Sequence, residues 1–390
     1  MTETFLHGVE LLEVDAGARP VETVRSSVIG LIGTAPLADA ATFPLNTPVL
    51  IANSRTLAAK LGTTGTLPDA VDSIFDQAGA VIVVVRVTEG ENETATMTNV
   101  VGGVNSVSGN YEGVHAFLGA ESVLGLVPRI LLAPGWTHQR TSSANAVVSE
   151  LVGIADRLRA VVIADGPNTT DAAAITYSND FGSKRVYVVD PWVKKLDSTG
   201  AVVSKPASAC VAGLIAKSDN ERGFWWSPSN QNINGIVGTS RPVDFALGDA
   251  ACRANVLNEQ GIATIIQQDG YRLWGNRTLT SDTKWIFLSV VRTADMINDS
   301  LQRAHLWAVD RNITKNYIHD VTEGVNAYLR HLVSIGAILG GKCWADPDLN
   351  TPASVQLGKV YFDFDFTPPY PAEHIIFRSQ LVNNYISEIF

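Results

Sequence analysis

The sequence predicts a multi-domain α/β protein, with a mostly parallel sheet in its central part and an α+β domain toward the C-terminus. Between residues 114 and 240, apolar strand patterns alternate with amphipathic helix patterns, which is typical of a parallel sheet with helices on its faces. Beyond residue 256, two long amphipathic helix patterns precede a strand with strict alternation. The length of 390 residues also exceeds the roughly 250 to 300 residues that one hydrophobic core normally holds.

Composition narrows the classes of protein to consider. Apolar residues make up 46% of the chain and charged residues 17%, so a sizeable core can form. The net charge of −10 argues against a broad nucleic-acid-binding surface. The three cysteines are far apart and odd in number, which favours buried, reduced thiols over a disulfide framework. The chain start has no signal-peptide pattern, and no apolar run reaches the roughly 18 residues of a membrane span, so we expect cytoplasmic folding without membrane insertion.

The first 113 residues predict short strands alternating with helices. Val81–Val87 is a continuous valine-rich run, which is typical of a strand covered on both faces. Asn53 and Ser54 are suited to cap the start of a helix. We further expect an extended segment at 7–20, strands at 28–34 and 48–51, a helix at 67–78, and a loop or decorated hairpin at 88–110.

The middle of the chain predicts repeated strand–helix–strand units. A helix over 142–159 places apolar residues such as Val148 and Leu151 on one face. Thr170 and Asp171 are expected to cap a second helix. The strands that accompany these helices are expected at 129–135, 160–165 and 185–191.

The last third has longer helical patterns. Residues 290–308 and 314–339 each repeat apolar positions at three- and four-residue steps, so both predict long amphipathic helices. Residues 360–366 alternate strictly, which predicts a half-buried strand with Phe362 and Phe364 on one face. Shorter apolar runs at 262–266 and 285–287 predict strands.

Both ends of the chain are expected to be extended segments outside a domain core. An unpaired strand is a liability unless another segment covers it. The residues alone leave two alternatives open: each end packs on its own domain, or each pairs with a neighbouring copy of the chain.

Several positions invite a chemical interpretation. Asp165 and Asp190 follow predicted strands, where doubly wound sheets bind ligands, yet Asp165-Gly166-Pro167 and Asp190-Pro191 are also ordinary turns. Gly30-Leu31-Ile32-Gly33 matches neither common phosphate-binding loop, so we expect no nucleotide cofactor. Trp225 and Trp226 are suited either to stack a sugar or base or to hold a loop on its own core.

Gly238-Thr239-Ser240 resembles the nucleophile tripeptide of subtilisin-like hydrolases. Arg241-Pro242 follows at once, and no motif supplies the histidine and aspartate partners of a catalytic triad. None of the seven histidines pairs with another at the spacing of helical metal ligands, so no metal site is expected. An inactive or cryptic hydrolase is therefore the alternative hypothesis, and no catalytic residue is assigned.

The segment Gly270–Thr278 combines two arginines, two aromatics and two glycines without any nucleophile–base pair. Such a segment is costly to desolvate and poor in chemistry, which favours contacts between macromolecules. We expect Arg272, Trp274 and Arg277 to form a structural cluster, with carboxylates from the same domain or a neighbouring chain holding both arginines.

Ordered blocks along nearly the whole chain resemble the sheath proteins of contractile phage tails, in particular those of temperate enterobacterial phages and R-type bacteriocins. Their order and spacing make the resemblance specific. The blocks include His7-Gly8-Val9, residues 42–51, Asn258-Glu259-Gln260-Gly261-Ile262, residues 269–278, 304–310 and 358–368.

The resemblance implies five parts in this sequence. These are an N-terminal arm at 1–24, an α/β subdomain at 25–113, a subtilisin-like α/β domain without protease activity at 114–255, an inner sheath domain at 256–372, and a C-terminal arm at 373–390. It also implies a helical sheath of identical subunits that contracts to drive an inner tail tube through a bacterial envelope. The implied partners are other copies of the chain, the inner tail tube protein, and the baseplate and tail terminator proteins. The implied location is the virion tail or a headless bacteriocin particle, two alternatives that stay open.

The resemblance further implies roles for single residues. Strand exchange between neighbouring subunits would use both arms, and the polar side of the helix at 314–339 would face the tube through Lys315 and Arg330. The expected arm contacts are Val9, Leu11, Val14, Ile376, Leu381 and Tyr385.

Overall fold

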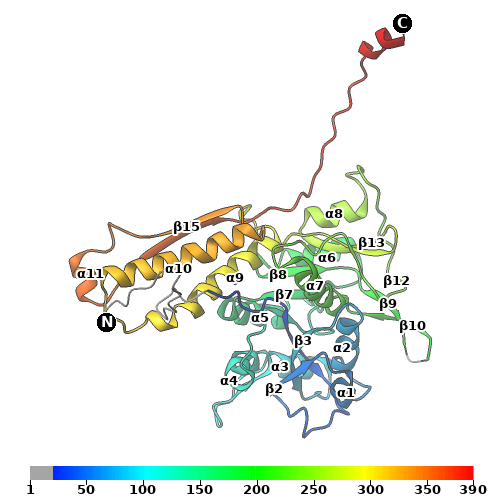
Figure 1. The fold of residues 1–390 in the computed structure, drawn as a ribbon. Helices are drawn as coiled ribbons and strands as arrows, with labels where there is room; N and C mark the ends of the chain where they lie inside the picture. Colours follow the sequence, from blue (N-terminus) through cyan, green and yellow to red (C-terminus); the bar gives the residue numbers. More distant parts are fainter. Residues whose placement is uncertain (1–20, 198, 390) are drawn as a thin grey trace, which may run out of the picture. The chain divides into compact units, whose positions relative to one another are not determined.

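The computed structural model describes residues 21–197 and 199–389, with side chains described through residue 386. The chain forms two compact units (Figure 1). The sheet unit comprises residues 27–222, 226–291 and 370–389, and the helix unit comprises 21–26, 223–225 and 292–369. The N-terminal arm residues Val9, Leu11 and Val14 lie outside the described residues.

A nine-stranded sheet organises the sheet unit, in the order β11-β14-β13-β8-β7-β6-β1-β3-β2. The six strands from β13 to β3 in this order run parallel to one another, as the alternation of strand and helix patterns predicted. Their bounds are β1 Val28–Thr34, β3 Val81–Val87, β6 Ile130–Leu132, β7 Val161–Asp165, β8 Val186–Val189 and β13 Ile262–Gln267.

Helices cover both faces of this sheet, so its central strands are apolar on both sides. In β3, Ile82 and Val84 pack into one core, and Val83 and Val85 pack into the other. The first core contains α2 (Leu67–Phe75) and α7 (Ser208–Arg222); the second contains α5 (Ala146–Leu158) and the 3₁₀ turn η2 (Gly113–Gly119). The prediction of a strand covered on both faces at 81–87 is therefore confirmed.

Antiparallel strands close the two edges of the sheet. On one side β2 (Pro48–Ala52) pairs with β3; on the other, β14 (Tyr271–Trp274) pairs with β13, and β11 (Gln231–Asn232) with β14. Residues 262–274 thus share one sheet with residues 161–189, although the sequence analysis placed them in the C-terminal domain. The reason is that β13 pairs in parallel with β8, a long-range contact that no local pattern encodes.

Smaller elements complete the sheet unit. Ser54 and Thr170 cap helices as expected, each accepting a backbone N–H in the first turn. These elements are α1 Arg55–Ala58, η1 Ala59–Leu61, α3 Glu93–Val101, β4 Gly103–Val104, β5 Tyr111–Glu112, α4 Ala120–Leu124, α6 Asp171–Ser178, β9 Val193–Leu196, β10 Val202–Lys205, β12 Gly238–Thr239 and α8 Arg253–Glu259.

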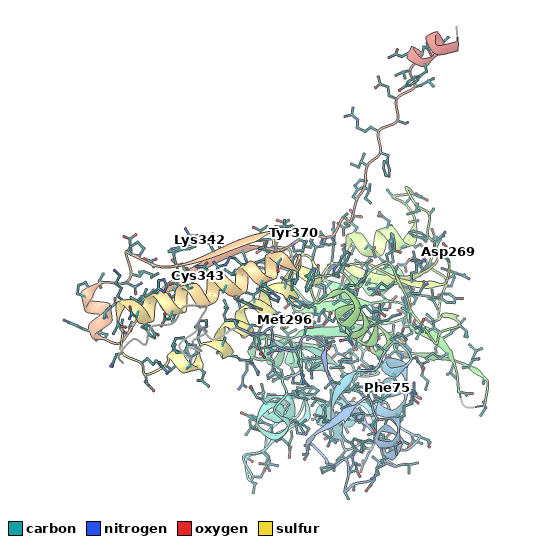
Figure 2. All side chains as sticks on the ribbon, viewed as in Figure 1. Phe75, Asp269, Met296, Lys342, Cys343 and Tyr370 are labelled. Atoms are coloured by element: carbon teal, nitrogen blue, oxygen red, sulfur yellow. The ribbon has the colours of Figure 1, made fainter. Side chains whose placement is uncertain are left out.

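The helix unit contains most of α9 (Leu288–Ala304) and all of α10 (Lys315–Ser334), which confirms the two long amphipathic helices. The ribbon of β15 (Gly340–Ala345) and β16 (Phe362–Thr367) packs against α10. Its core includes Met296 of α9 and Cys343 of β15 (Figure 2), together with the predicted phenylalanine face of β16. The remaining elements are η3 Leu306–Ala308 and α11 Pro352–Gln356, and η4 Asn384–Ile389 ends the tail of the sheet unit.

Two sequence expectations differ from the structure. The segment expected at 88–110 as a loop or decorated hairpin does end in the antiparallel pair of β4 and β5. It also contains helix α3, whose buried face is only Thr96 and Val100, too few apolar positions for a periodic pattern. Residues 285–287 form no strand; they contribute one isolated bridge, between Phe287 and Arg277. The cysteines Cys210, Cys252 and Cys343 are buried and free, as predicted.

Candidate functional site

A short antiparallel pairing in the sheet unit brings two side chains of different segments together. The amide of Thr278 donates to the carbonyl of Ile286 at 2.7 Å, and the amide of Leu288 donates to the carbonyl of Asn276 at 2.9 Å. Between these bonds, Arg277 and Phe287 stand directly opposite each other. Opposed residues in an antiparallel pair project to the same side.

Both of these side chains hold the start of the C-terminal tail, whose base at Tyr370 is labelled in Figure 2. The guanidinium of Arg277 binds the carboxylate of Glu373 in a two-pronged ion pair, with Nε donating to Oε1 at 2.7 Å and Nη2 to Oε2. The ring of Phe287 contacts that of Tyr370 edge to face, with centroids 6.2 Å apart. The hydrogen bonds to Glu373 raise the pKa of Arg277, so its guanidinium stays charged.

Beyond Glu373 the tail is apolar and exposed. No strand lies between residues 370 and 386, and Figure 1 draws the tail as an extended trace that ends in the helical turn η4. Phe377 is 92% exposed and Leu381 98% exposed, and the expected arm contacts Ile376 and Tyr385 are exposed as well. Side chains of this kind normally lie in cores, so the exposed tail is suited to contact another surface.

The expected cluster of Arg272, Trp274 and Arg277 is divided in the structure. Trp274 packs against Phe245, with ring centroids 4.9 Å apart. Arg272 donates to the carbonyl oxygens of Gln268 and Asn230 and to the Asn230 side chain. Arg277 therefore has a carboxylate partner, whereas Arg272 bonds to oxygens of Gln268 in the turn before β14 and of Asn230 just before β11.

Arg277 also lines an open pocket of about 350 Å³ with polar and apolar walls. The loop after α6 and the turn after α8 form its other walls. Its lining residues are Ser178, Asn179, Phe181, Gly182, Glu259, Gln260, Gly261, Thr278, Leu279, Thr280, Ser281 and Ile286.

Asp165 at the end of β7 has a structural role. Its carboxylate is fully buried and accepts from the amide and hydroxyl of Ser208 at 2.8 and 2.6 Å, so it holds the start of α7. Burial raises its pKa to about 6, although these hydrogen bonds oppose that shift. Asp190 is also fully buried, and Arg241 binds it. Burial is the main cause of its raised pKa, and Arg241 acts against it. Both aspartates are therefore tied to neighbouring segments.

Among the residues that the structure describes, the hydrogen bonds of Ser240 include none that would activate it as a nucleophile. Its hydroxyl donates to the side-chain oxygen of Asn168, and its amide donates to the carbonyl of Trp192. An amide oxygen cannot accept a proton as a general base at neutral pH. The paired tryptophans also separate: Trp225 packs edge to face on Phe224, while Trp226 is 49% exposed beneath Arg222.

Lys315 and Arg330, the expected tube-facing residues, are both exposed on α10. Arg330 contacts Glu323 at 3.5 Å, a pair with high exposure on both sides. Across residues 21–197 and 199–389, no group of three potential metal-ligating side chains occurs. Within the same ranges, no helix is long and apolar enough to span a membrane.

Sequence reasoning missed Phe287, Tyr370 and Glu373, the residues that join the tail to the sheet unit. Tyr370 stands between prolines, and Glu373 lies at the predicted start of the arm. Arg277 and Glu373 are 96 residues apart in sequence and Phe287 and Tyr370 are 83 apart, so the sequence showed only an arginine that needs a carboxylate.

Comparison with known proteins identifies the family. Three family models match in order: the tail sheath protein Gp18 domain III N-terminal region at residues 26–87, the phage tail sheath protein central domain at 109–279, and the phage tail sheath C-terminal domain at 280–382. A prophage major tail sheath protein of Pseudomonas aeruginosa strain UCBPP-PA14 is 47% identical over 388 residues, which cover 99% of each chain. The tail sheath protein of Escherichia phage P2 is 36% identical over 99% of this chain and 98% of its own.

Solved structures with the same fold agree with this assignment. The helical sheath of the anti-feeding prophage in its contracted state superposes with a TM-score of 0.73 at 20% identity, covering 97% of this chain and 99% of that one. The sheath complex of an extracellular contractile injection system, also contracted, gives a TM-score of 0.71 at 19% identity, covering 98% and 99%. With relatives this similar over its whole length, the chain belongs to the phage tail sheath protein family and is a structural subunit of a tail sheath.

Proposed function

We propose that this subunit polymerises with copies of itself into a contractile sheath around an inner tail tube, and that its terminal arms link neighbouring subunits. The observation that carries this proposal is the exposed, apolar tail beyond Glu373 in a member of a sheath family. Exposed apolar residues such as Phe377 and Leu381 gain free energy when a second chain covers them, at about 25 cal/mol per Å² of buried apolar surface.

The β15–β16 ribbon supports this proposal as a place where an arm can pair. Among the described residues it is a two-stranded sheet, so each strand has one edge without a strand neighbour. A two-stranded ribbon is marginal by itself, and an added strand would satisfy its open N–H and C=O groups. Arms that exchange in this way keep subunits joined while the units slide past one another.

The drive for contraction would be a difference in buried interface between two lattices, without nucleotide hydrolysis. The structures matched include contracted sheaths and a baseplate of the anti-feeding prophage, which supports a baseplate as a further partner. The tube protein and a tail terminator complete the proposed set of partners. Assembly would take place in the host cytoplasm, before the particle is released.

Removing the arm tests the polymer hypothesis directly. A chain that ends at residue 372 should remain a folded monomer, because the residues removed bury nothing in a core. We expect circular dichroism and thermal unfolding like those of the full chain, and no tubes by negative-stain electron microscopy. Normal tubes from the shortened chain would contradict the role of the C-terminal arm. Deleting residues 1–20 is the corresponding test for the N-terminal arm.

We further propose that the polar side of α10 faces the tail tube through Lys315 and Arg330. Both side chains are exposed, and a few exposed cationic groups would hold an acidic or polar tube weakly enough to release it. Lys315→Glu and Arg330→Glu should impair assembly on preformed tubes while leaving self-assembly intact. Unchanged sedimentation with tubes would rule out this contact.

We propose that the chain has no hydrolase activity, since Asn168 takes the place of a general base beside Ser240. A fluorophosphonate probe should leave Ser240 unlabelled under conditions that label an active serine hydrolase. Labelling of Ser240 that is lost in Ser240→Ala would restore the enzyme hypothesis.

A further inference from the structure

We propose that Arg277 and Phe287 form a clamp that fixes where and in which direction the C-terminal arm leaves the subunit. The clamp consists of the ion pair between Arg277 and Glu373 and the ring contact between Phe287 and Tyr370. This inference rests on the proposed function, in which the arm reaches a second copy of the chain, and it names the residues that position that arm.

The backbones of Arg277 and Phe287, the two residues of the clamp, are paired with each other. Arg277 and Phe287 are opposite partners in one antiparallel bridge, and hydrogen bonds on both sides of the bridge hold their backbones in register. The hydroxyl of Thr278 adds bonds to the carbonyls of Trp285 and Ile286, at 3.4 and 3.2 Å. This pairing holds the backbones of Arg277 and Phe287 in place relative to each other. Their two contacts therefore restrain the path of residues 370–373.

The segment that the clamp holds, residues 370–373, is itself restricted in backbone conformation. Pro371 lies between the two gripped residues, and Pro368 and Pro369 precede them. Each proline ring restricts φ to about −65° and removes a backbone donor, so this stretch cannot fold back into a helix or a central strand. Two anchors on a restrained segment determine a direction as well as a point of attachment.

The clamp also attaches the arm to the sheet unit. Along the chain, the arm follows β16 of the helix unit, yet residues 370–389 belong to the sheet unit. Tyr370, the first residue after that change, is the first residue gripped. From residue 374 to 386 every residue is exposed, and the clamp lies directly before this exposed segment. A rearrangement between the units during contraction would therefore leave the root of the arm attached to the sheet unit.

The ion pair is suited to this positioning role. The side chains of Arg277 and Glu373 are 32% and 33% exposed, so the pair is shielded enough to be directional and open enough to respond to salt. A two-pronged arginine–carboxylate pair fixes the angle between the groups, which lysine in place of arginine would not do.

The test separates the clamp from the arm. A nitroxide attached at Ala372→Cys, between the two anchors, reports the mobility of the arm root in the unpolymerised protein; the native cysteines are buried. Arg277→Glu should increase nitroxide mobility and raise the protein concentration for half-maximal assembly about tenfold. The double variant Arg277→Glu with Glu373→Arg should restore both values. Lys284→Glu is the matched control: it makes the same charge change on an exposed residue near the same bridge.

Each outcome bears on a different claim. Unchanged nitroxide mobility in Arg277→Glu would overturn the clamp, whatever happens to assembly. Raised mobility with normal assembly would overturn its positioning role. If the chain ending at residue 372 still assembles, the arm hypothesis fails, while the mobility result still decides whether the clamp exists. Recovery in the charge-swapped double variant distinguishes the ion pair from a general loss of folding.

Discussion

Strand β3 and the C-terminal tail contain similar apolar residues and are in opposite situations. Val83 and Val84 of β3 are fully buried, each on a different face of the sheet, whereas Phe377 and Leu381 of the tail are more than nine-tenths exposed. Strand β3 has ladder partners on both edges, β1 and β2, and the tail has none within the described residues. The difference shows that similar apolar side chains can be covered or left exposed by the same chain. Other segments of the chain bury those of β3, and they leave those of the tail exposed.

The largest expected effect tests the buried side of this comparison. Leu131→Ala in β6 should lower the free energy of unfolding by about 2–5 kcal/mol, because Leu131 is fully buried and closely surrounded. Gly30 lies so near that a Cβ added there would stand 2.7 Å from a methyl carbon of Leu131. Urea unfolding of the unpolymerised protein measures the loss. A loss below 1 kcal/mol would mean that the central sheet is looser than its packing indicates.

Asp165 is an ionisable side chain in the buried part of the sheet unit, so it allows a second test there, through the pH dependence of stability. Because its pKa is about 6 in the folded chain and about 3.9 when unfolded, the folded state binds the proton more strongly. Its contribution to stability is therefore full below about pH 4 and is lost as the pH rises through 6, with a total of about 3 kcal/mol. Unfolding free energies from pH 4 to 8 should show this decline, and Asp165→Asn should remove most of it. A variant with an unchanged slope would assign the pH dependence to other groups.

A smaller effect is expected at the ion pair between Arg277 and Glu373, where the tail joins the sheet unit. Arg277→Ala should destabilise the monomer by less than about 1 kcal/mol, since the ion pair is partly exposed, and the difference should shrink at high salt. Thermal unfolding in low and high salt measures both quantities. A loss of several kcal/mol would mean that the tail root contributes to the core of the sheet unit.

The smallest effect on the monomer is expected in the tail. Leu381→Ser should change the unfolding free energy by no more than about 0.5 kcal/mol, because Leu381 is 98% exposed. The same substitution should nevertheless reduce tube formation in electron micrographs, because it removes apolar surface from the proposed contact. Equal tube formation with and without Leu381 would exclude this residue from the interface.

Local sequence patterns were sufficient for the strands and helices with a strong period. The valine run at 81–87, the caps Ser54 and Thr170, and the alternating phenylalanines of β16 each encode their structure within a few residues. Helix α3 was not predicted because its two buried positions are too few to form a helical repeat. Strand β15 was not predicted because it begins with Gly340 and Gly341 and contains few apolar residues. The assignment of Arg272 to a carboxylate failed because its oxygens come from Gln268 and Asn230, and no local pattern places Asn230, 42 residues away, beside it.

By itself the sequence determined the α/β class, the apolar arms, the absence of a recognisable triad and the resemblance to tail sheaths, because all of these lie in residue types and short spacings. Only the tertiary structure decided that β13 and β14 extend the central sheet, that Asp165 holds the start of α7, and that Glu373 meets Arg277. Each of these joins residues that are distant along the chain. Their pairing depends on which surfaces the folded sheet brings together, and the residue types alone leave many partners possible.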